Sequence, residues 1–269
     1  MTLLTEPTRI VLAKGWDLSG SDVDAAAYIQ RVEWADTTPL EAATRTAINS
    51  FVVGCKADGI WTAIKASCIL SGARTLSGAL MPLTGAAPTN FNFVTGDYNR
   101  KTGLMGNGST KYLDSNRNNN ADPQNSQHLT VQISTMSTGF VVIGAGPDVT
   151  GSSMIGNTNG GGNIFLRSRT ATTSSITPTI SYSNGFLGMS RSSNSAGTVQ
   201  NNANQSNFTA TSETPYNGNI FVFANNGGGV VSAASNARIT FYSIGENLNL
   251  ALLNTRVTTL INAFAAAIP

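Results

Sequence analysis

The sequence predicts a mainly β protein, an antiparallel jelly-roll β-sandwich with a helical segment before it and one helix after it. From residue 128 onward, short apolar runs recur at fairly regular spacing and are separated by clusters of Asn, Gly and Ser. Before residue 72 and again near the end, apolar residues recur every three or four positions, as in helices. We therefore expect an extended arm over 1–20, helices and a connector over 21–90, and the sandwich with its closing helix over 91–269.

Capping patterns predict where the first two helices begin. Ser21 and Asp24 have the spacing of a capping box, with Ser21 as N-cap, and predict a helix over 22–35. Thr38, Pro39 and Glu41 form a stronger capping box, because proline suits the first helical position. The second helix should therefore begin at Pro39 and end at the Asp-Gly pair at 58–59.

The next segment carries a weaker helical pattern. Apolar residues at 60, 61, 64 and 68 suggest a third short helix that ends before residue 72. Residues 73–92 contain two prolines and two glycines, so we expect a connector with little regular structure.

The sandwich should begin in the stretch 96–118, which we interpret as two short strands around a glycine turn with Tyr112 and Leu113 pointing inward. Turn clusters are expected at 158–163, 201–207 and 225–229. A final apolar stripe predicts a helix over 248–266. The further strands are expected at 128–135, 139–146, 163–170, 179–182, 186–190, 197–200, 219–224 and 237–244.

Composition excludes several classes of partner. Charged residues make up 11% of the chain, against about 25% in ordinary soluble domains, and the net charge is +2. With no basic cluster longer than Arg100–Lys101, nucleic-acid binding is not expected. No apolar run reaches eighteen residues and no signal-peptide pattern begins the chain, so we expect a soluble protein without an export signal or a membrane segment. Cys55 and Cys68 lie in apolar, helical-looking contexts and should be reduced core residues.

Catalytic signals are weak. The single histidine, His128, has no metal-binding spacing, and we interpret it as a strand-edge residue. The chain has no GxSxG motif and no phosphate-binding glycine loop, so we expect no catalytic residue and no cofactor. Between residues 121 and 245 the only carboxylates are Asp122, Asp148 and Glu213, too few for the paired acids of a glycoside hydrolase.

One loop partly resembles a calcium site. Asp114, Asn116 and Asn118 place oxygen-bearing side chains at alternate positions, as calcium loops do. Asn119 stands where such a loop needs glycine, and Asn125 where it needs glutamate. We prefer a solvated Asn-rich loop, and expect no metal site.

Three segments resemble a known family. GDYNRKTGLMGNGSTKYLDSN at 96–116 is similar to the opening strand of concanavalin-A-like, laminin-G-like jelly-roll domains in structural proteins of tailed bacteriophages, including cyanophages and marine phages. The ending at 236–268 contains FYSIG followed by a helix, and resembles the end of the same domains. The helical lead-in at 45–73 is similar to the segment that precedes them. No sugar or calcium ligand of the family matches a position here.

The resemblance implies a non-enzymatic structural protein on the virion surface, made in the host cytoplasm and carried on the particle. We expect a capsid decoration or cement protein, anchored to capsid or tail subunits by its arm and helices and assembled as a homo-oligomer. The alternative is a carbohydrate-binding adhesin in a tail or head fibre that recognises host polysaccharide, with Tyr182, Phe186 and Tyr216 as glycan contacts. A polysaccharide hydrolase is a third possibility. The expected assembly contacts are Leu3, Leu4, Ile10, Val11 and Leu12.

Overall fold

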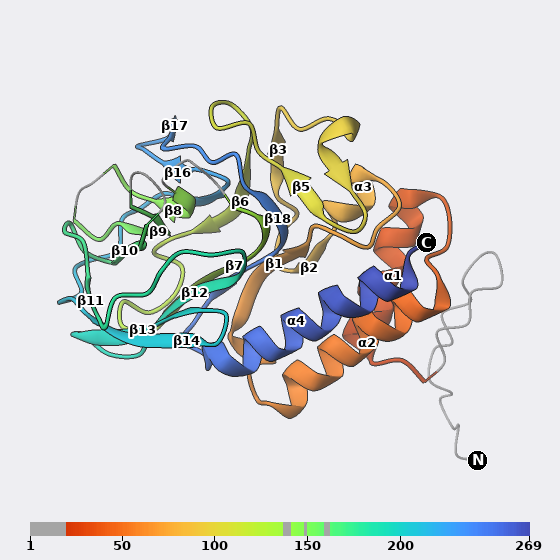
Figure 1. The fold of residues 1–269 in the computed structure, drawn as a ribbon, viewed down its shortest axis with the longest axis horizontal. Coiled ribbons are helices and arrows are strands. Elements are labelled where there is room, and N and C mark those ends of the chain that lie inside the picture. The colour runs from red at the N-terminus through yellow and green to blue at the C-terminus, as the bar shows by residue number, and fades with distance from the viewer. Residues whose placement is uncertain (1–19, 137–140, 148–149, 159–161) are drawn as a thin grey trace, which may run out of the picture.

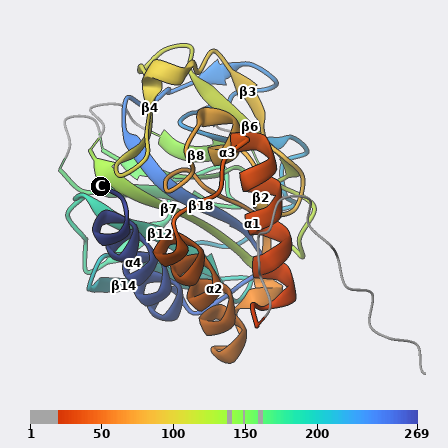
Figure 2. The same cartoon turned by 90° about the vertical axis from the view of Figure 1, so that its right-hand side faces the viewer.

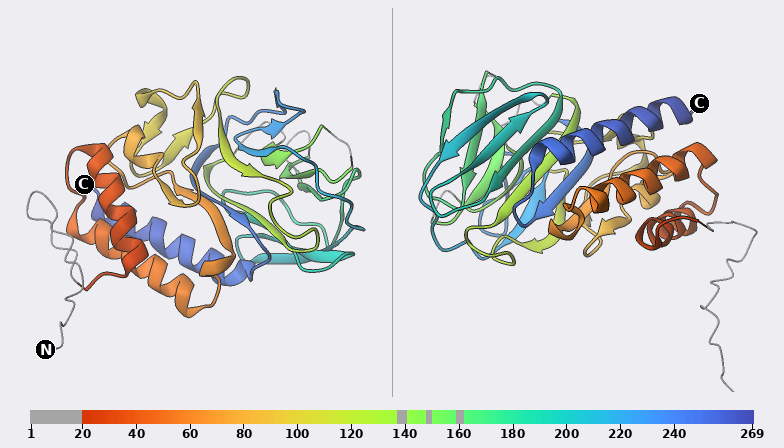
Figure 3. Two further views of the ribbon diagram at one scale, coloured as in Figure 1. Left: turned by 180° about the vertical axis from the view of Figure 1, so that it is seen from behind. Right: turned by 90° about the horizontal axis from the view of Figure 1, so that it is seen from below.

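A layer of helices and two facing β-sheets make up the chain in the computed structural model (Figure 1), which describes residues 20–136, 141–147, 150–158 and 162–269. The helices lie against the outer face of one sheet, sheet A, and leave the second sheet, sheet B, on the far side (Figure 3). The predicted fold class, a mainly β sandwich of jelly-roll type with helices before and after it, is confirmed.

Sheet A, within the described residues, has ten strands in the order β11-β14-β13-β12-β7-β18-β1-β2, with β5 and β4 joined to β18. Neighbouring strands in it pair antiparallel. The bounds are β1 (Ile64–Ile69), β2 (Pro82–Thr84), β4 (Tyr98–Asn99), β5 (Gly103–Met105), β7 (Gln127–Thr135), β11 (Ser175–Thr177), β12 (Gly185–Arg191), β13 (Ala196–Asn201), β14 (Asn204–Thr209) and β18 (Arg238–Gly245).

Sheet B, within the same described residues, has eight strands in the order β10-β9-β8-β15-β6-β3, with the hairpin β16–β17 attached through β8. Its pairs are antiparallel except for β16 with β8, which run parallel. The bounds are β3 (Thr89–Phe91), β6 (Tyr112–Asn118), β8 (Val141–Ala145), β9 (Ser153–Asn157), β10 (Ile164–Ser168), β15 (Asn219–Val222), β16 (Asn225–Asn226) and β17 (Val231–Ser232).

The two faces of sheet A pack against different cores. Alternate side chains of a strand point to opposite faces, so β18 places Tyr242 in the core between the sheets and Phe241 in the core under the helices. In β1, Cys68 and Ile69 divide in the same way. Strands buried on both faces therefore join the sandwich to the helical layer.

The helical layer consists of α1 (Val23–Asp36), α2 (Ala42–Ala57) and α4 (Leu250–Ala267), with α2 in contact with both of the others (Figure 2). Shorter helical turns are η1 (Trp61–Ala63), α3 (Leu76–Ala79) and η2 (Thr95–Asp97). The division of the chain at residue 90 stays a prediction, and β1 and β2, which precede it, pair within sheet A.

The first two helices begin later than predicted. Asp22, and not Ser21, is the N-cap of α1, because its carboxylate accepts the Asp24 amide at 3.0 Å. Helix α2 begins at Ala42 and not at Pro39, since Glu41 is its N-cap residue and makes no side-chain cap. Arg100 donates to both Glu41 carboxylate oxygens at 3.1 and 2.7 Å, and this hydrogen bonding holds the Glu41 pKa down at about 2. A tertiary ion pair has replaced the predicted capping box.

The predicted third helix is wrong, because Ile64–Ile69 form strand β1 and only Trp61–Ala63 form a short helical turn. Ala66 and Cys68 face the sandwich core while Ile64 and Ile69 face the helices, so the apolar run is buried on both sides. A short apolar run of this kind fits a buried strand as well as a helix. This segment forms a strand because it pairs antiparallel with β18.

Most of the other strands lie where they were expected. The predicted strand at 179–182 is wrong, because β11 precedes it and Ser181 makes only an isolated bridge to Asn163. The turn cluster at 201–207 is mostly strand β14, whose hairpin turn needs only Asn202 and Ala203. Strand β9 was not predicted. The cluster at 158–163 lies partly outside the described residues.

The stretch 96–118 opens the sandwich as predicted, through β4, β5 and β6. Gly103 has φ +91°, and a Cβ there would lie 2.2 Å from the Ile239 carbonyl oxygen, so only glycine lets β5 approach β18. Leu113 is buried in the core, but Tyr112 faces the other way, since consecutive residues of a strand alternate. The expectation that both point inward is therefore wrong.

Helix α4 closes the chain close to the predicted range. Asn249 caps it by accepting the amides of Ala251 and Leu252. By length and apolar composition it is the one helix among the described residues that could cross a membrane. Its apolar stripe packs on α2 and β12, and 28% of its residues are buried.

The two cysteines are free and buried, as predicted, although Cys68 lies in a strand and not in a helix. Burial raises the pKa of each thiol to about 12, and only thiolate reacts fast. We expect Ellman's reagent at pH 8 to label no thiol in the folded protein and two after unfolding in guanidinium. Labelling of the folded protein at the rate of free glutathione would contradict this burial.

Candidate functional site

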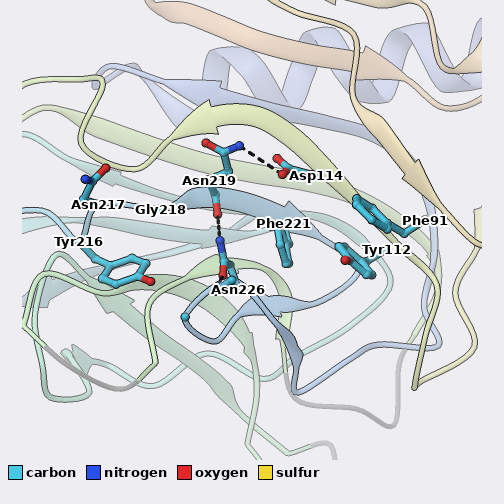
Figure 4. A pocket seen from close by; sticks show the side chains of 11 residues that line it. Phe91, Tyr112, Asp114, Tyr216, Asn217, Gly218, Asn219, Phe221 and Asn226 are labelled. Atoms are coloured by element: carbon cyan, nitrogen blue, oxygen red, sulfur yellow. Dashed lines mark hydrogen bonds between the residues drawn. The ribbon is translucent and has the colours of Figure 1, made fainter.

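An open groove of about 510 Å³ lies on the outer face of sheet B, away from the helices. Its floor comes from β6 and β15, and its sides from β3, the loop before β15 and the β16–β17 hairpin (Figure 4). Its volume falls within the range of small-molecule and sugar sites. It is lined by Phe91, Tyr112, Asp114, Tyr216, Asn217, Gly218, Asn219, Phe221, Asn226, Gly228 and Gly229.

Three aromatic rings form a row across three neighbouring strands. Phe91 lies directly opposite Tyr112 in the β3–β6 register, and their rings stack with centroids 4.4 Å apart and planes 5° apart. The Tyr112 ring then contacts Phe221 on β15 at 4.6 Å and 33°. Exposure decreases along the row, from 36% at Phe91 to 4% at Phe221. The three rings lie in a row (Figure 4) and form an apolar wall whose Phe91 end is exposed.

Polar groups lie beside this wall. Asp114 accepts the Asn116 amide at 2.8 Å through one carboxylate oxygen and the Asn219 side-chain amide at 3.2 Å through the other. Asn217 accepts a hydrogen bond from Asn118 at 2.7 Å. Within the described residues, the Asn219 Oδ1 and Asn217 Nδ2 atoms make no hydrogen bond. The groove therefore presents both acceptors and a donor to a hydroxyl-rich ligand.

Local backbone geometry holds the far side of the groove. Asn226 donates to the Asn219 carbonyl at 2.8 Å and accepts the Gly229 amide at 2.6 Å, which ties the β16–β17 hairpin to β15. Gly228 and Gly229 both have positive φ, as a tight turn requires. Gly218 lets the Tyr216 ring lie close, because a Cβ there would be 2.4 Å from that ring.

The electrostatics of the groove come mainly from one carboxylate. Burial, and then the nearby Asp114 carboxylate, raise the pKa of Tyr112, so this phenol stays neutral and can donate. A hydrolase that cleaves glycosides uses two carboxyl groups across the bond, and the groove contains one. Among the described residues no group of three or more His, Cys, Asp or Glu side chains could hold a metal.

The three residues of the calcium candidate lie along β6 beside the groove, and each makes hydrogen bonds within the protein. Asp114 accepts the Asn116 amide, and Asn118 accepts the amides of Asn120 and Gly218 at 3.0 and 3.1 Å. Asn116 has φ 54° and donates to the Ala87 carbonyl. The three residues belong to strand β6, so the solvated Asn-rich loop expected there is wrong, and the expectation of no metal site stays a prediction.

Of the three predicted glycan contacts, only Tyr216 lies in the groove. Phe186 is fully buried under the helical layer, and Tyr182 is 4% exposed in the core between the sheets, so neither can contact a glycan. Large aromatic residues in strands are usually core residues. The predicted assembly contacts Leu3, Leu4, Ile10, Val11 and Leu12 lie outside the described residues.

His128 is not at a strand edge. Strand β7 lies between β12 and β18, and the imidazole is fully buried. Its Nδ1 donates to the Glu246 carbonyl at 2.6 Å, which leaves Nε2 to accept from the Ser243 hydroxyl at 2.7 Å. Ser243 is also fully buried, so this Ser-His pair presents no accessible nucleophile.

Phe91, Tyr112 and Phe221, the row of rings, were not predicted as site residues. They are far apart in the sequence, and only the β3–β6–β15 register brings them together. The sequence analysis singled out two parts of the groove, the stretch 96–118 and Tyr216, but did not predict that they lie side by side. A strand register is set by long-range pairing, which a single sequence does not display.

No protein-family model matches the chain, and no curated protein is similar to it. Solved structures share the sandwich at low identity. Domain 4 of AbnA, a GH43 extracellular arabinanase from Geobacillus stearothermophilus, in complex with arabinotriose, is 14% identical, with TM-score 0.39 over 64% of this chain and 82% of that one. Domains LG4-5 of the mouse laminin α1 chain are 14% identical, with TM-score 0.37 over 63% and 47%.

A Trypanosoma rangeli sialidase in complex with 2,3-difluorosialic acid is 13% identical, with TM-score 0.37 over 81% of this chain and 39% of that one. The chain thus spans less than half the length of the laminin and sialidase chains. At these TM-scores the likenesses carry no argument about function.

Proposed function

We propose that this protein is a non-catalytic carbohydrate-binding protein and that it holds a glycan in the groove of sheet B. The observation that carries the proposal is the row of rings Phe91, Tyr112 and Phe221 beside Asp114 and unengaged Asn side-chain atoms. The C–H groups of a sugar ring pack on the electron-rich face of an aromatic ring, while its hydroxyls need donors and acceptors nearby. The groove offers both, because Phe91 is 36% exposed at the end of the row, and Asp114, Asn217 and Asn219 line the groove beside it.

The position of the groove supports a role in attachment. It lies on the sheet farther from the helical layer, so a particle bound to the helices would leave the groove accessible (Figure 1). The finer proposal is an adhesin on a bacteriophage virion, supported by the sequence resemblance at 96–116 and 236–268. Capsid decoration, partners among capsid or tail subunits, and a homo-oligomeric state stay predictions.

Alanine substitutions in the groove test the proposal. We expect the purified protein to bind specific glycans on an array, and Phe91→Ala and Tyr216→Ala each to weaken binding about tenfold or more, as loss of an aromatic contact does. Both residues keep part of their surface exposed, so folding should persist, and thermal unfolding checks this.

Phe165→Ala is the matched control, because Phe165 is a half-buried aromatic residue of β10 in the same sheet but outside the groove. Its glycan binding should equal that of the unaltered protein. Absence of any glycan binding, or equal loss in all three variants, would rule out the groove as the site.

A further inference from the structure

The groove carries a single formal charge. Of its lining residues only Asp114 is acidic, and none is Lys or Arg; the others are aromatic, Asn or Gly. We propose that Asp114 is a specificity residue that makes the groove select neutral and amine-bearing glycans over acidic ones. This inference rests on the proposed function.

The Asp114 carboxylate is held in place and not neutralised. In the β6 register it lies between Thr89 of β3 and Phe221 of β15, at the centre of the groove floor. Its hydrogen-bond donors are an amide of the backbone and the Asn219 side chain, both uncharged. These bonds fix its direction without cancelling its charge.

The nearest basic residues along β6 are engaged elsewhere. Arg117 forms an ion pair with Asp122, and Lys111 with Asp97. Across the described part of the chain, no Lys or Arg lies within ion-pair distance of Asp114. An acidic sugar in the groove would therefore meet an uncompensated negative charge.

The physical consequence is a difference between ligand classes. A ligand carboxylate near Asp114 is repelled, and at a partly exposed site we expect this to weaken binding on the order of tenfold. A ligand ammonium group is attracted by the same carboxylate. Both effects are electrostatic, so both should shrink in about 1 M salt, where the screening length is about 3 Å.

The test uses β-1,4-linked hexamers of glucose, glucosamine and glucuronic acid, or the same three substitutions on whichever backbone binds best on the array. We expect the unaltered protein to bind the neutral and amine-bearing hexamers about tenfold more tightly than the acidic one at low salt. Asp114→Asn should bring the three affinities within about threefold of one another, whatever its effect on the affinity for the neutral hexamer.

Glu246→Gln is the matched control, because it removes one negative charge on sheet A, where Glu246 pairs with Lys65 outside the groove. It should keep the full discrimination. If the acidic hexamer binds the unaltered protein as tightly as the neutral one, or if Asp114→Asn discriminates unchanged, the selectivity proposal is overturned while the glycan site stands. If no glycan of any class binds, the proposed function itself fails, and the selectivity with it.

Discussion

Replacing Arg191 with alanine is expected to lower the free energy of unfolding by about 3 kcal/mol, since a buried acceptor left without a donor costs about 1–3 kcal/mol and the lost side chain leaves a cavity. The guanidinium is fully buried and donates to the carbonyls of Ser168 at 2.6 Å, Ser193 at 2.9 Å and Ala210 at 3.0 Å. It also lies over the Phe208 ring at 5.5 Å. Alanine would leave these carbonyls unpaired around a cavity.

Urea unfolding measures this loss, and Arg191→Lys separates its causes. Lysine keeps the charge, but its single ammonium cannot span three carbonyls, so an intermediate loss is expected. Arg31→Ala is the matched control, because Arg31 is exposed and makes one hydrogen bond, to the Pro82 carbonyl at 3.0 Å. It should cost less than about 1 kcal/mol. Equal losses for Arg191→Ala and Arg31→Ala would mean that the hydrogen bonds of Arg191 do not stabilise the fold.

Acidification is expected to destabilise the protein through His128, the only histidine in the chain. Burial lowers the pKa of His128 from 6.5 to about 4. Between these values the unfolded chain binds a proton that the folded chain refuses, so stability falls as pH falls. The expected loss is about 2 kcal/mol between pH 7 and pH 5, and about 3 kcal/mol by pH 4.

The comparison with His128→Gln isolates this contribution. Carboxylates with lowered pKa, such as Asp22 and Glu41, lose their stabilising effect only at lower pH, so the window from pH 7 to 5 reports mainly on the histidine. The variant will be less stable overall, but its stability should be nearly flat across this window. An equal pH slope in both proteins, or an NMR titration of the imidazole near pH 6.5, would contradict the buried neutral state.

The capping predictions show where local rules lose to long-range contacts. Thr38, Pro39 and Glu41 have a favourable N-terminal pattern, yet α2 begins later because Glu41 pairs with Arg100. In the predicted helix the Leu40 amide would lie in the first turn. In the structure it donates instead to the buried Glu33 carboxylate at 2.8 Å. A capping box contributes about 1 kcal/mol, so a charged pair formed by the fold can displace it.

The predicted glycan contacts show a second limit of local reasoning, because residue type does not reveal burial. Tyr182, Phe186 and Tyr216 were equally plausible contacts by residue type, and burial alone separates them. Strand β12 is buried on both faces, and its consecutive side chains alternate. Phe186 therefore faces the helices while its neighbour Leu187 faces the core between the sheets. Tyr216 reaches the groove because it precedes β15 in a loop.

The sequence by itself determined the class of fold, the order of its parts and most strand positions, because alternation, helical spacing and turn residues are local signals. It also identified Cys55 and Cys68 as buried reduced thiols. The tertiary structure alone decided that β1 is a strand, that His128 is buried, and that Phe91, Tyr112 and Phe221 form one surface. Each of these depends on which strands pair and in what register, and that choice comes from packing between residues far apart in the chain.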